Sequence, residues 1–479
     1  MTIMNDETRE FVAMHRNEDV RELALKAKRV EGLDLPLALD QIAGWQIARK
    51  KLPQWASCEG IVYPPHISME QCSSQFTAQY KSEIAQTLLA PAATVRARVS
   101  DSGESDNQTT KSEPQLSDSA ESVMQTAKSA FQLSDSPESD TLVAKRAMVD
   151  LTGGFGVDFS YLARGFSQAT YVERQRHLCD LAEHNMAALG LDQARIVCGD
   201  GVEYLRQMGP VDFIYLDPAR RDEHGSRTYA IEDCTPNVLE LRDLLLAKSQ
   251  YTLVKLSPML DWRKAVADFD GTVREVHIVA TGNECKELLL VLGQQVHEEP
   301  SAPRVFCVND NQRIDYDSAA YTQGLRIGGK PLPEAKNYLY EPNASIMKAG
   351  CFDLVEERFG VTQVGPSSHL FVSATPVADF PGRGFAIESI GGMNKKDIKR
   401  LLNGTKQANI AVRNFPLTAP QLRKKLKLAD GGPVYLFGTT MQGCDHVLLR
   451  TSKSEKTNRN RKKKQANRDW QRQSRKTAY

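Results

Sequence analysis

Between residues 148 and 218 the chain carries glycines and acidic residues at the ends of successive apolar segments, where they could bind a polar ligand. The first of these segments leads into DLTGGFGVD at residues 150–158. Glycines such as Gly154 and Gly156 let the backbone approach a ligand closely, and the start of a helix offers unpaired N–H groups. Asp150 can order the turn and accept hydrogen bonds from the ligand. This segment therefore predicts a cofactor-binding loop.

Three more acidic residues follow later apolar segments. Glu173, in TYVERQ, lies 23 positions beyond Asp150 and is suited to accept hydrogen bonds from both hydroxyls of a ribose. Asp200 follows ARIVC, where a carboxylate can reach an adenine edge, and FIYLD ends in Asp217-Pro218. Any one of these residues alone is often only a helix cap. Their order along the chain favours a nucleoside-containing ligand.

The spacing of the glycines argues against a dinucleotide cofactor. A dinucleotide-binding turn follows the pattern G-x-G-x-x-G/A, in which the last small residue allows close helix packing. Here that position is occupied by Phe159. We therefore do not expect binding of nicotinamide or flavin dinucleotides.

These residues need a scaffold that brings strand ends together, and the surrounding sequence predicts one. Strand-like and helix-like segments alternate between residues 148 and 292, as expected for a doubly wound α/β fold with a mostly parallel, seven-stranded sheet. The expected strands are MVDL, ATYVE, ARIVC, FIYLD, YTLVKL, REVHIVA and ELLLVL. Ligands of open α/β sheets bind at the carboxyl ends of the strands, where the residues above would lie.

The motif D-x-T-x-G-x-G-x-D, followed by Glu173, Asp200 and D-P, resembles the successive motifs of class I S-adenosylmethionine-dependent methyltransferases. The resemblance implies that S-adenosyl-L-methionine is the cofactor. It also implies a set of cofactor-binding residues, namely Asp150, Thr152, Gly154, Gly156, Asp158, Glu173 and Asp200.

The wider sequence resembles bacterial methyltransferases with a ferredoxin-like segment and a C-terminal THUMP-like domain. The segments that carry this resemblance are MEQCSSQFTAQYK, YLDPARRD, NECKELL, YEPNASIMKAG and FAIESI. THUMP domains accompany RNA modification, so the resemblance implies methyl transfer to RNA, on a base of rRNA or tRNA. Two alternatives stay open. One is an RNA-binding protein with a retained but non-catalytic cofactor pocket, and the other is a methyltransferase for a protein or a small molecule.

The predicted catalytic residues are Asp217, Pro218 and Arg220, and they differ from the pattern of enzymes that methylate exocyclic base nitrogens. Those enzymes usually have D/N-P-P-Y/F, whose aromatic ring stacks on the flipped base. Here the residues are D-P-A-R, so stacking would come from elsewhere, such as Tyr229, or the acceptor is not an exocyclic amine. Arg220, together with the arginines at 221 and 227, suits an anionic substrate, although loop arginines are often only solvated.

The rest of the chain predicts further domains around this one. Residues 97–145 contain a Ser- and Asp-rich repeat whose copies begin at Val99, Leu116 and Leu133, and such a composition predicts disorder. The expected parts are an N-terminal helical domain (1–96), an acidic linker (97–145), the methyltransferase domain (146–295), a ferredoxin-like connecting α+β segment (296–382), a THUMP-like domain (383–452) and a basic disordered tail (453–479).

Composition narrows the possible location of the protein. The nine cysteines are scattered and never form C-x-x-C, and no run of about 18 apolar residues occurs. The histidines lack the spacing of a metal site. We therefore expect a cytoplasmic protein without a bound metal. Its oligomeric state is not predicted.

The terminal segment 453–479 is strongly basic, with eleven lysines and arginines against two acidic residues, a balance of +9. Lysines and arginines that contact phosphates displace condensed counterions, with a log–log salt slope of about −0.7 per contact for single strands. Truncation after Thr451 is therefore expected to weaken RNA binding and to flatten its salt dependence. RNA binding at several salt concentrations checks this, and equal slopes for the two proteins would identify the tail as an inert solvated terminus.

Overall fold

The computed structural model describes residues 4–26, 31–64, 66–91, 146–220, 231–294, 302–321, 336–443 and 446–453. The predicted linker, the tail beyond Lys453, and residues 221, 227 and 229 lie outside the described residues, as does the side chain of Arg220. By its internal contacts the chain forms two compact units. The first comprises residues 1–216 and 244–252, and the second comprises residues 217–243 and 253–479.

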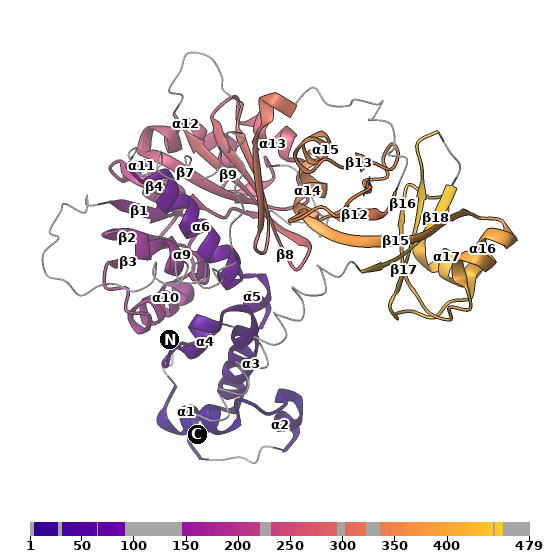
Figure 1. The fold of residues 1–479 in the computed structure, drawn as a ribbon. Coiled ribbons are helices and arrows are strands. Elements are labelled where there is room, and N and C mark those ends of the chain that lie inside the picture. The colour runs from indigo at the N-terminus through magenta and orange to yellow at the C-terminus, as the bar shows by residue number, and fades with distance from the viewer. Residues whose placement is uncertain are drawn as a thin grey trace, which may run out of the picture. The chain divides into compact units, whose positions relative to one another are not determined.

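The N-terminal part of the first unit is helical, as the sequence analysis expected (Figure 1). Its helices are α1 (Asp6–His15), α2 (Val20–Lys26), α3 (Leu35–Lys51), α4 (Pro53–Ser57), α5 (His66–Gln71) and α6 (Gln75–Leu88). Side chains of Asn5, Asp34 and Ser74 accept hydrogen bonds from backbone N–H groups in the first turns of α1, α3 and α6. Such caps satisfy donors that a helix start leaves open. They explain why these three helices begin where they do.

The larger sheet has the strand order β11-β10-β8-β9-β7-β4-β1-β2-β3. Its strands are β1 (Ala147–Asp150), β2 (Gln168–Glu173), β3 (Ala194–Cys198), β4 (Val211–Leu216), β7 (Ser249–Leu256), β8 (Val273–Thr281), β9 (Glu284–Gly293), β10 (Arg304–Asn309) and β11 (Gln312–Asp317). Strands β3, β2, β1 and β4 pair in parallel, whereas β9 runs antiparallel to β8. The predicted doubly wound, mostly parallel sheet is confirmed.

The segments between these strands form α9 (Val157–Leu162), the 3-10 turn η3 (Ala163–Gly165), α10 (Arg176–Ala188), α11 (Gly201–Gln207), α12 (Val238–Lys248) and α13 (Trp262–Asp268), and the 3-10 turn η4 (Ser318–Tyr321) follows β11. The two-residue strands β5 (Ala219–Arg220) and β6 (Cys234–Thr235) pair antiparallel.

The sheet has nine strands rather than the seven that we predicted. The two additional strands, β10 and β11, come from residues that we assigned to the ferredoxin-like segment. Strand β10 pairs in parallel with β8, and β11 then folds back as a hairpin. Val305, Cys307 and Val308 are buried in this pairing. A short apolar run predicts a strand but not the sheet that it joins, which explains the difference.

The smaller sheet, in the second unit, has the order β13-β14-β12-β15-β18-β17-β16. Its strands are β12 (Tyr338–Pro342), β13 (Thr362–Gln363), β14 (Phe371–Ser373), β15 (Gly382–Gly392), β16 (Asn409–Arg413), β17 (Val434–Thr440) and β18 (His446–Lys453). The chain segments between these strands form α14 (Ala344–Ala349), α15 (Phe352–Phe359), α16 (Lys395–Leu402) and α17 (Ala419–Leu426).

Strand β15 holds this sheet together, because its first half pairs with β12 and its second half with β18. Strand β18 continues to Lys453, two residues beyond the truncation point that the sequence suggested. A truncation that leaves this sheet intact therefore belongs after Lys453.

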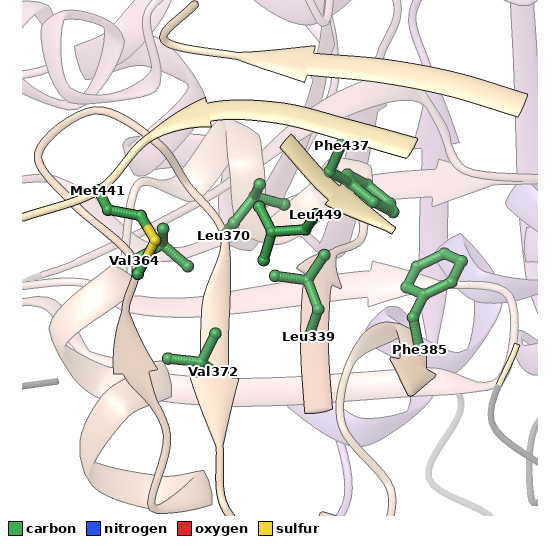
Figure 2. Close-up of a cluster of buried hydrophobic side chains, with 8 residues drawn as sticks. All are labelled: Leu339, Val364, Leu370, Val372, Phe385, Phe437, Met441 and Leu449. Carbon is green, nitrogen blue, oxygen red and sulfur yellow. The ribbon is translucent and has the colours of Figure 1, made fainter. Parts of the chain in front are cut away.

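Two apolar clusters cover the two faces of the smaller sheet. Neighbouring residues of β17, Leu436 and Phe437, belong to different clusters, as do Leu448 and Leu449 of β18. This alternation follows from the pleat of a strand, which points successive side chains to opposite faces. Figure 2 shows the cluster that contains Phe437, whose ring lies 5.0 Å from that of Phe385 in a T-shaped arrangement.

Replacing Phe437 by alanine is expected to destabilise the second unit by about 3 to 5 kcal/mol, because the ring is buried and its loss leaves a cavity between β15 and β17. Denaturant unfolding followed by circular dichroism measures the change. The control is Leu25→Ala, since Leu25 is 87% exposed and its truncation removes little buried surface. Equal unfolding curves for the two variants would contradict the packing described here.

Candidate functional site

The glycine-rich turn between β1 and α9 is held by hydrogen bonds within the chain. The buried carboxylate of Asp150 accepts the backbone N–H of Thr152 at 2.9 Å. Gly154 and Gly156 have φ angles of +55° and +80°, in the left-handed region that glycine adopts without strain. Asp150, Thr152, Gly154 and Gly156 thus form one turn, as the motif predicted.

At two other positions of the site, neighbouring atoms of the protein leave no room for a side chain, so glycine is required there. A Cβ atom on Gly153 would lie 2.2 Å from the ring of Tyr171 in β2. A Cβ atom on Gly201, at the start of α11, would lie 2.1 Å from the carbonyl oxygen of Leu151. Such distances exclude any side chain. The turn is therefore fixed between β2 and α11, and these two glycines do not themselves indicate a ligand.

Glu173, at the end of β2, joins the ends of three neighbouring strands. Its Oε2 accepts the N–H of Gly154 at 3.0 Å, and its Oε1 accepts the N–H of Gln175 at 2.9 Å. Its backbone carbonyl accepts the N–H of Gly199, just after β3, at 2.9 Å. Since a carboxylate offers about four acceptor positions, Glu173 can still accept hydrogen bonds from ligand hydroxyls.

The two glycines that Glu173 bonds, Gly154 and Gly199, border open space. A Cβ atom on Gly199 would meet no atom within 4 Å, and one on Gly154 would meet only the carbonyl oxygen of Thr152, at 3.7 Å. A ligand could therefore approach both glycines and the carboxylate between them. This opening lies at the carboxyl ends of β1, β2 and β3, where ligands of open α/β sheets bind.

Asp200 follows Gly199 and caps α11. Its Oδ1 accepts the N–H groups of Val202 at 2.9 Å and Glu203 at 3.1 Å, and the residue is exposed. The helix-cap interpretation thus accounts for the position of Asp200. A contact between its carboxylate and an adenine stays a prediction.

Asp158 differs from the other predicted cofactor residues, because its carboxylate is buried and bound to protein groups. Its Oδ1 accepts Nζ of Lys81 at 2.9 Å. Its Oδ2 accepts the hydroxyls of Ser73 at 2.8 Å and Tyr215 at 2.7 Å. Lys81 is fully buried and also donates to Ser73. These contacts give Asp158 a structural role, so any effect on the cofactor would be exerted through the position of α9.

The N-terminal helices contact α9 at a second place. The indole N–H of Trp55 in α4 donates to the hydroxyl of Ser160 at 3.1 Å, and its ring lies 5.1 Å from that of Phe155. Sequence reasoning did not identify Trp55, Ser73 or Lys81 as partners of this region. The only signal was the segment MEQCSSQFTAQYK, which contains Ser73 and Lys81.

Asp217 directly follows β4, whose neighbour in the sheet is β1. The Oδ2 atom of Asp217 accepts a hydrogen bond from Nζ of Lys255 in β7 at 2.5 Å, and both residues belong to the second unit. The Asp217 side chain is 40% exposed. Pro218 comes next, and the backbone of Arg220 pairs with Cys234 between β5 and β6. Lys255 was missed by sequence reasoning, although it is a single charged residue within the apolar strand YTLVKL.

Metal-ligand clusters and membrane-spanning helices are both absent from the described part of the chain. Among those residues, no three histidine, cysteine or acidic side chains gather as metal ligands would. None of the helices there combines the length and apolar character that crossing a membrane requires.

Comparison with known proteins identifies two C-terminal domains. Residues 338–381 match the family described as a ferredoxin-like domain, and residues 382–453 match the family described as THUMP domain-like. Both domains were implied by the resemblance noted in the sequence, and they are confirmed. No curated protein matches the chain.

A solved structure shares the fold of nearly the whole chain. It is a "putative methyltransferase" from Porphyromonas gingivalis W83, with 29% sequence identity and a TM-score of 0.73, covering 94% of this chain and 98% of that one. A SAM-dependent methyltransferase from Agrobacterium tumefaciens matches 32% of this chain and 58% of its own length, at 18% identity and a TM-score of 0.25. The first match covers the complete fold, whereas the second covers about a third of this chain.

Replacing Lys81 by methionine is expected to destabilise the protein by about 3 to 5 kcal/mol, because it leaves the buried Asp158 carboxylate without its positive partner. Thermal and denaturant unfolding measure the loss. The matched control is Lys264→Met, which breaks the exposed Lys264–Asp268 pair and is expected to change little. If both variants unfolded at the wild-type midpoint, the buried pair would not contribute to stability.

Proposed function

We propose that this chain is an S-adenosyl-L-methionine-dependent methyltransferase that acts on RNA, on a base of rRNA or tRNA. The observation that carries the proposal is the opening around Glu173. There a carboxylate with remaining acceptor capacity lies between two glycines whose backbone is accessible. The full-length likeness to the Porphyromonas gingivalis protein supports the same activity.

The residues at this opening fit the cofactor. Glu173 would accept hydrogen bonds from the ribose hydroxyls. The turn at Gly154 and Gly156 would let the amino-acid part approach the backbone, and the exposed carboxylate of Asp200, next to Gly199, would contact the adenine. When bound, the cofactor supplies a methyl group already activated by its sulfonium.

Because the methyl group is already activated, the protein chiefly has to align the acceptor. Asp217 is suited to this task, since its carboxylate is half-exposed and is held on one side by the ammonium of Lys255. A carboxylate fixed in this way can accept a hydrogen bond from an N–H of the acceptor and so orient the attacking lone pair. The backbone carbonyl of Pro218 can accept a second one.

RNA is the favoured substrate because residues 382–453 match the THUMP domain-like family. The residues D-P-A-R leave two alternatives to be tested: a cofactor-binding protein without turnover, and a methyltransferase for a protein or a small molecule. Each alternative predicts cofactor binding without methylated RNA, whereas our proposal predicts cofactor binding and methylated RNA.

Gly199→Trp is expected to abolish binding of S-adenosylmethionine and S-adenosylhomocysteine, because the indole would fill the opening next to Glu173. The backbone at Gly199 does not have a positive φ, so the substitution adds no strain of that kind. Gly209→Trp is the matched control, since a side chain at Gly209 also enters open space, beyond the end of α11. Calorimetric titration measures cofactor binding for each variant.

The same proteins are then incubated with total RNA and cofactor labelled in its methyl group. We expect labelled RNA with the wild type and with Gly209→Trp, and none with Gly199→Trp. Binding of NADH in place of either methionine cofactor would refute the proposal. Cofactor binding with label only in protein or in small molecules would refute its RNA part.

A further inference from the structure

Helices α16 and α17 cover the same face of the smaller sheet. Leu401 of α16 and Leu422 and Leu426 of α17 belong to one buried cluster, together with Leu436 and Leu448 of the strands. The two helices lie side by side at the end of the sheet in Figure 1. Their polar sides therefore point away from the sheet together, over a single surface.

The arginines in this part of the chain bind groups of the protein itself. Arg450 pairs with Glu388 at 2.7 Å and donates to the carbonyls at 401 and 402, at the end of α16. Arg423 pairs with Asp430 at 2.5 Å and donates to the carbonyls at 408 and 429. Arg400 pairs with Asp397 at 3.1 Å. The planar guanidinium suits such multiple, directed hydrogen bonds.

The lysines on this surface behave differently. Seven of them are exposed: Lys395, Lys396, Lys399, Lys406, Lys424, Lys425 and Lys427. Within the described part of the chain they form no ion pair, because Asp397, Asp430 and Glu388 are each paired with an arginine. These seven lysines, which we term the lysine face, carry seven positive charges; Lys396 interacts electrostatically with Asp397, and the described residues show no ion pair for the other six.

We propose that the lysine face is the surface on which the RNA phosphate backbone docks, which rests on the RNA-directed function proposed above. An ammonium on a flexible stem binds a phosphate as a point charge, without the fixed geometry that reading a base requires. The surface therefore holds RNA independently of its sequence, and selection of the nucleotide is left to the methyltransferase domain. Unlike the terminal tail, these charges are carried by α16, α17 and the residues that directly follow the two helices.

The test uses the full chain and a single-stranded uridine homopolymer, with binding measured by fluorescence anisotropy at several salt concentrations. One variant carries Lys395→Gln, Lys396→Gln and Lys399→Gln, and a second carries Lys424→Gln, Lys425→Gln and Lys427→Gln. Glutamine preserves helix propensity, and each change lies on an exposed position, so folding should be retained. Using two separate variants keeps the test decisive if one of them folds poorly.

The matched control removes the same charge elsewhere, through Lys50→Gln, Lys264→Gln and Lys286→Gln. Each lysine that contacts a phosphate contributes about 0.7 to the log–log salt slope for single strands, so each triple variant of the lysine face is expected to reduce the slope by about 2. The control should keep the wild-type slope. Cofactor titrations of all variants should match the wild type.

Equal slopes for the two lysine-face variants and the control would overturn the proposal, as would binding of the wild type to anionic phosphatidylserine vesicles without binding to RNA. Failure of the methyltransferase proposal is recognised separately. In that case RNA binding would still depend on the lysine face, but no variant, nor the wild type, would bind S-adenosylmethionine.

Discussion

The rest of the first unit depends on the ion pair and hydrogen bonds of one buried group, the carboxylate of Asp158. Removing a charge from water costs several kcal/mol unless partners compensate for the lost hydration. Here the partners come from different parts of the chain: Lys81 from α6, Ser73 from the residues before it, and Tyr215 from β4. The carboxylate therefore requires the N-terminal helices, α9 and the sheet to be assembled together. Because α9 starts directly after the glycine-rich turn, this requirement also positions the turn.

The glycines of the site serve two distinct purposes. Gly153 and Gly201 are required by contacts within the protein, since Tyr171 and the backbone at Leu151 occupy the space that a side chain would need. Gly154 and Gly199 border open space, so internal packing does not explain the lack of a side chain there. Gly154 also needs its positive φ, whereas Gly199 does not. What distinguishes Gly199 from Gly209, which also borders open space, is its hydrogen bond to the carbonyl of Glu173.

Local patterns in the sequence predicted the strands from Met148 to Leu292 and the turn at Gly154 and Gly156, because strand alternation and turn glycines are encoded within a few residues. The position of β10 and β11 in the larger sheet was not predicted, since pairing between distant strands leaves no local trace. The partners of Asp158 and Asp217 were missed for a similar reason. Lys81 and Lys255 resemble ordinary helix and strand residues until the fold brings each one next to a carboxylate.

The sequence of the THUMP-like domain shows only a basic region, and it did not predict that the arginines would pair with acidic residues while the lysines stay exposed.

The most direct test of the whole account is mass spectrometry of nucleosides from RNA that has been incubated with the protein and S-adenosylmethionine deuterated in its methyl group. The account predicts one nucleoside that carries the deuterated methyl group and that is absent when the protein is omitted. A protein that binds the cofactor but leaves every nucleoside unlabelled would contradict it.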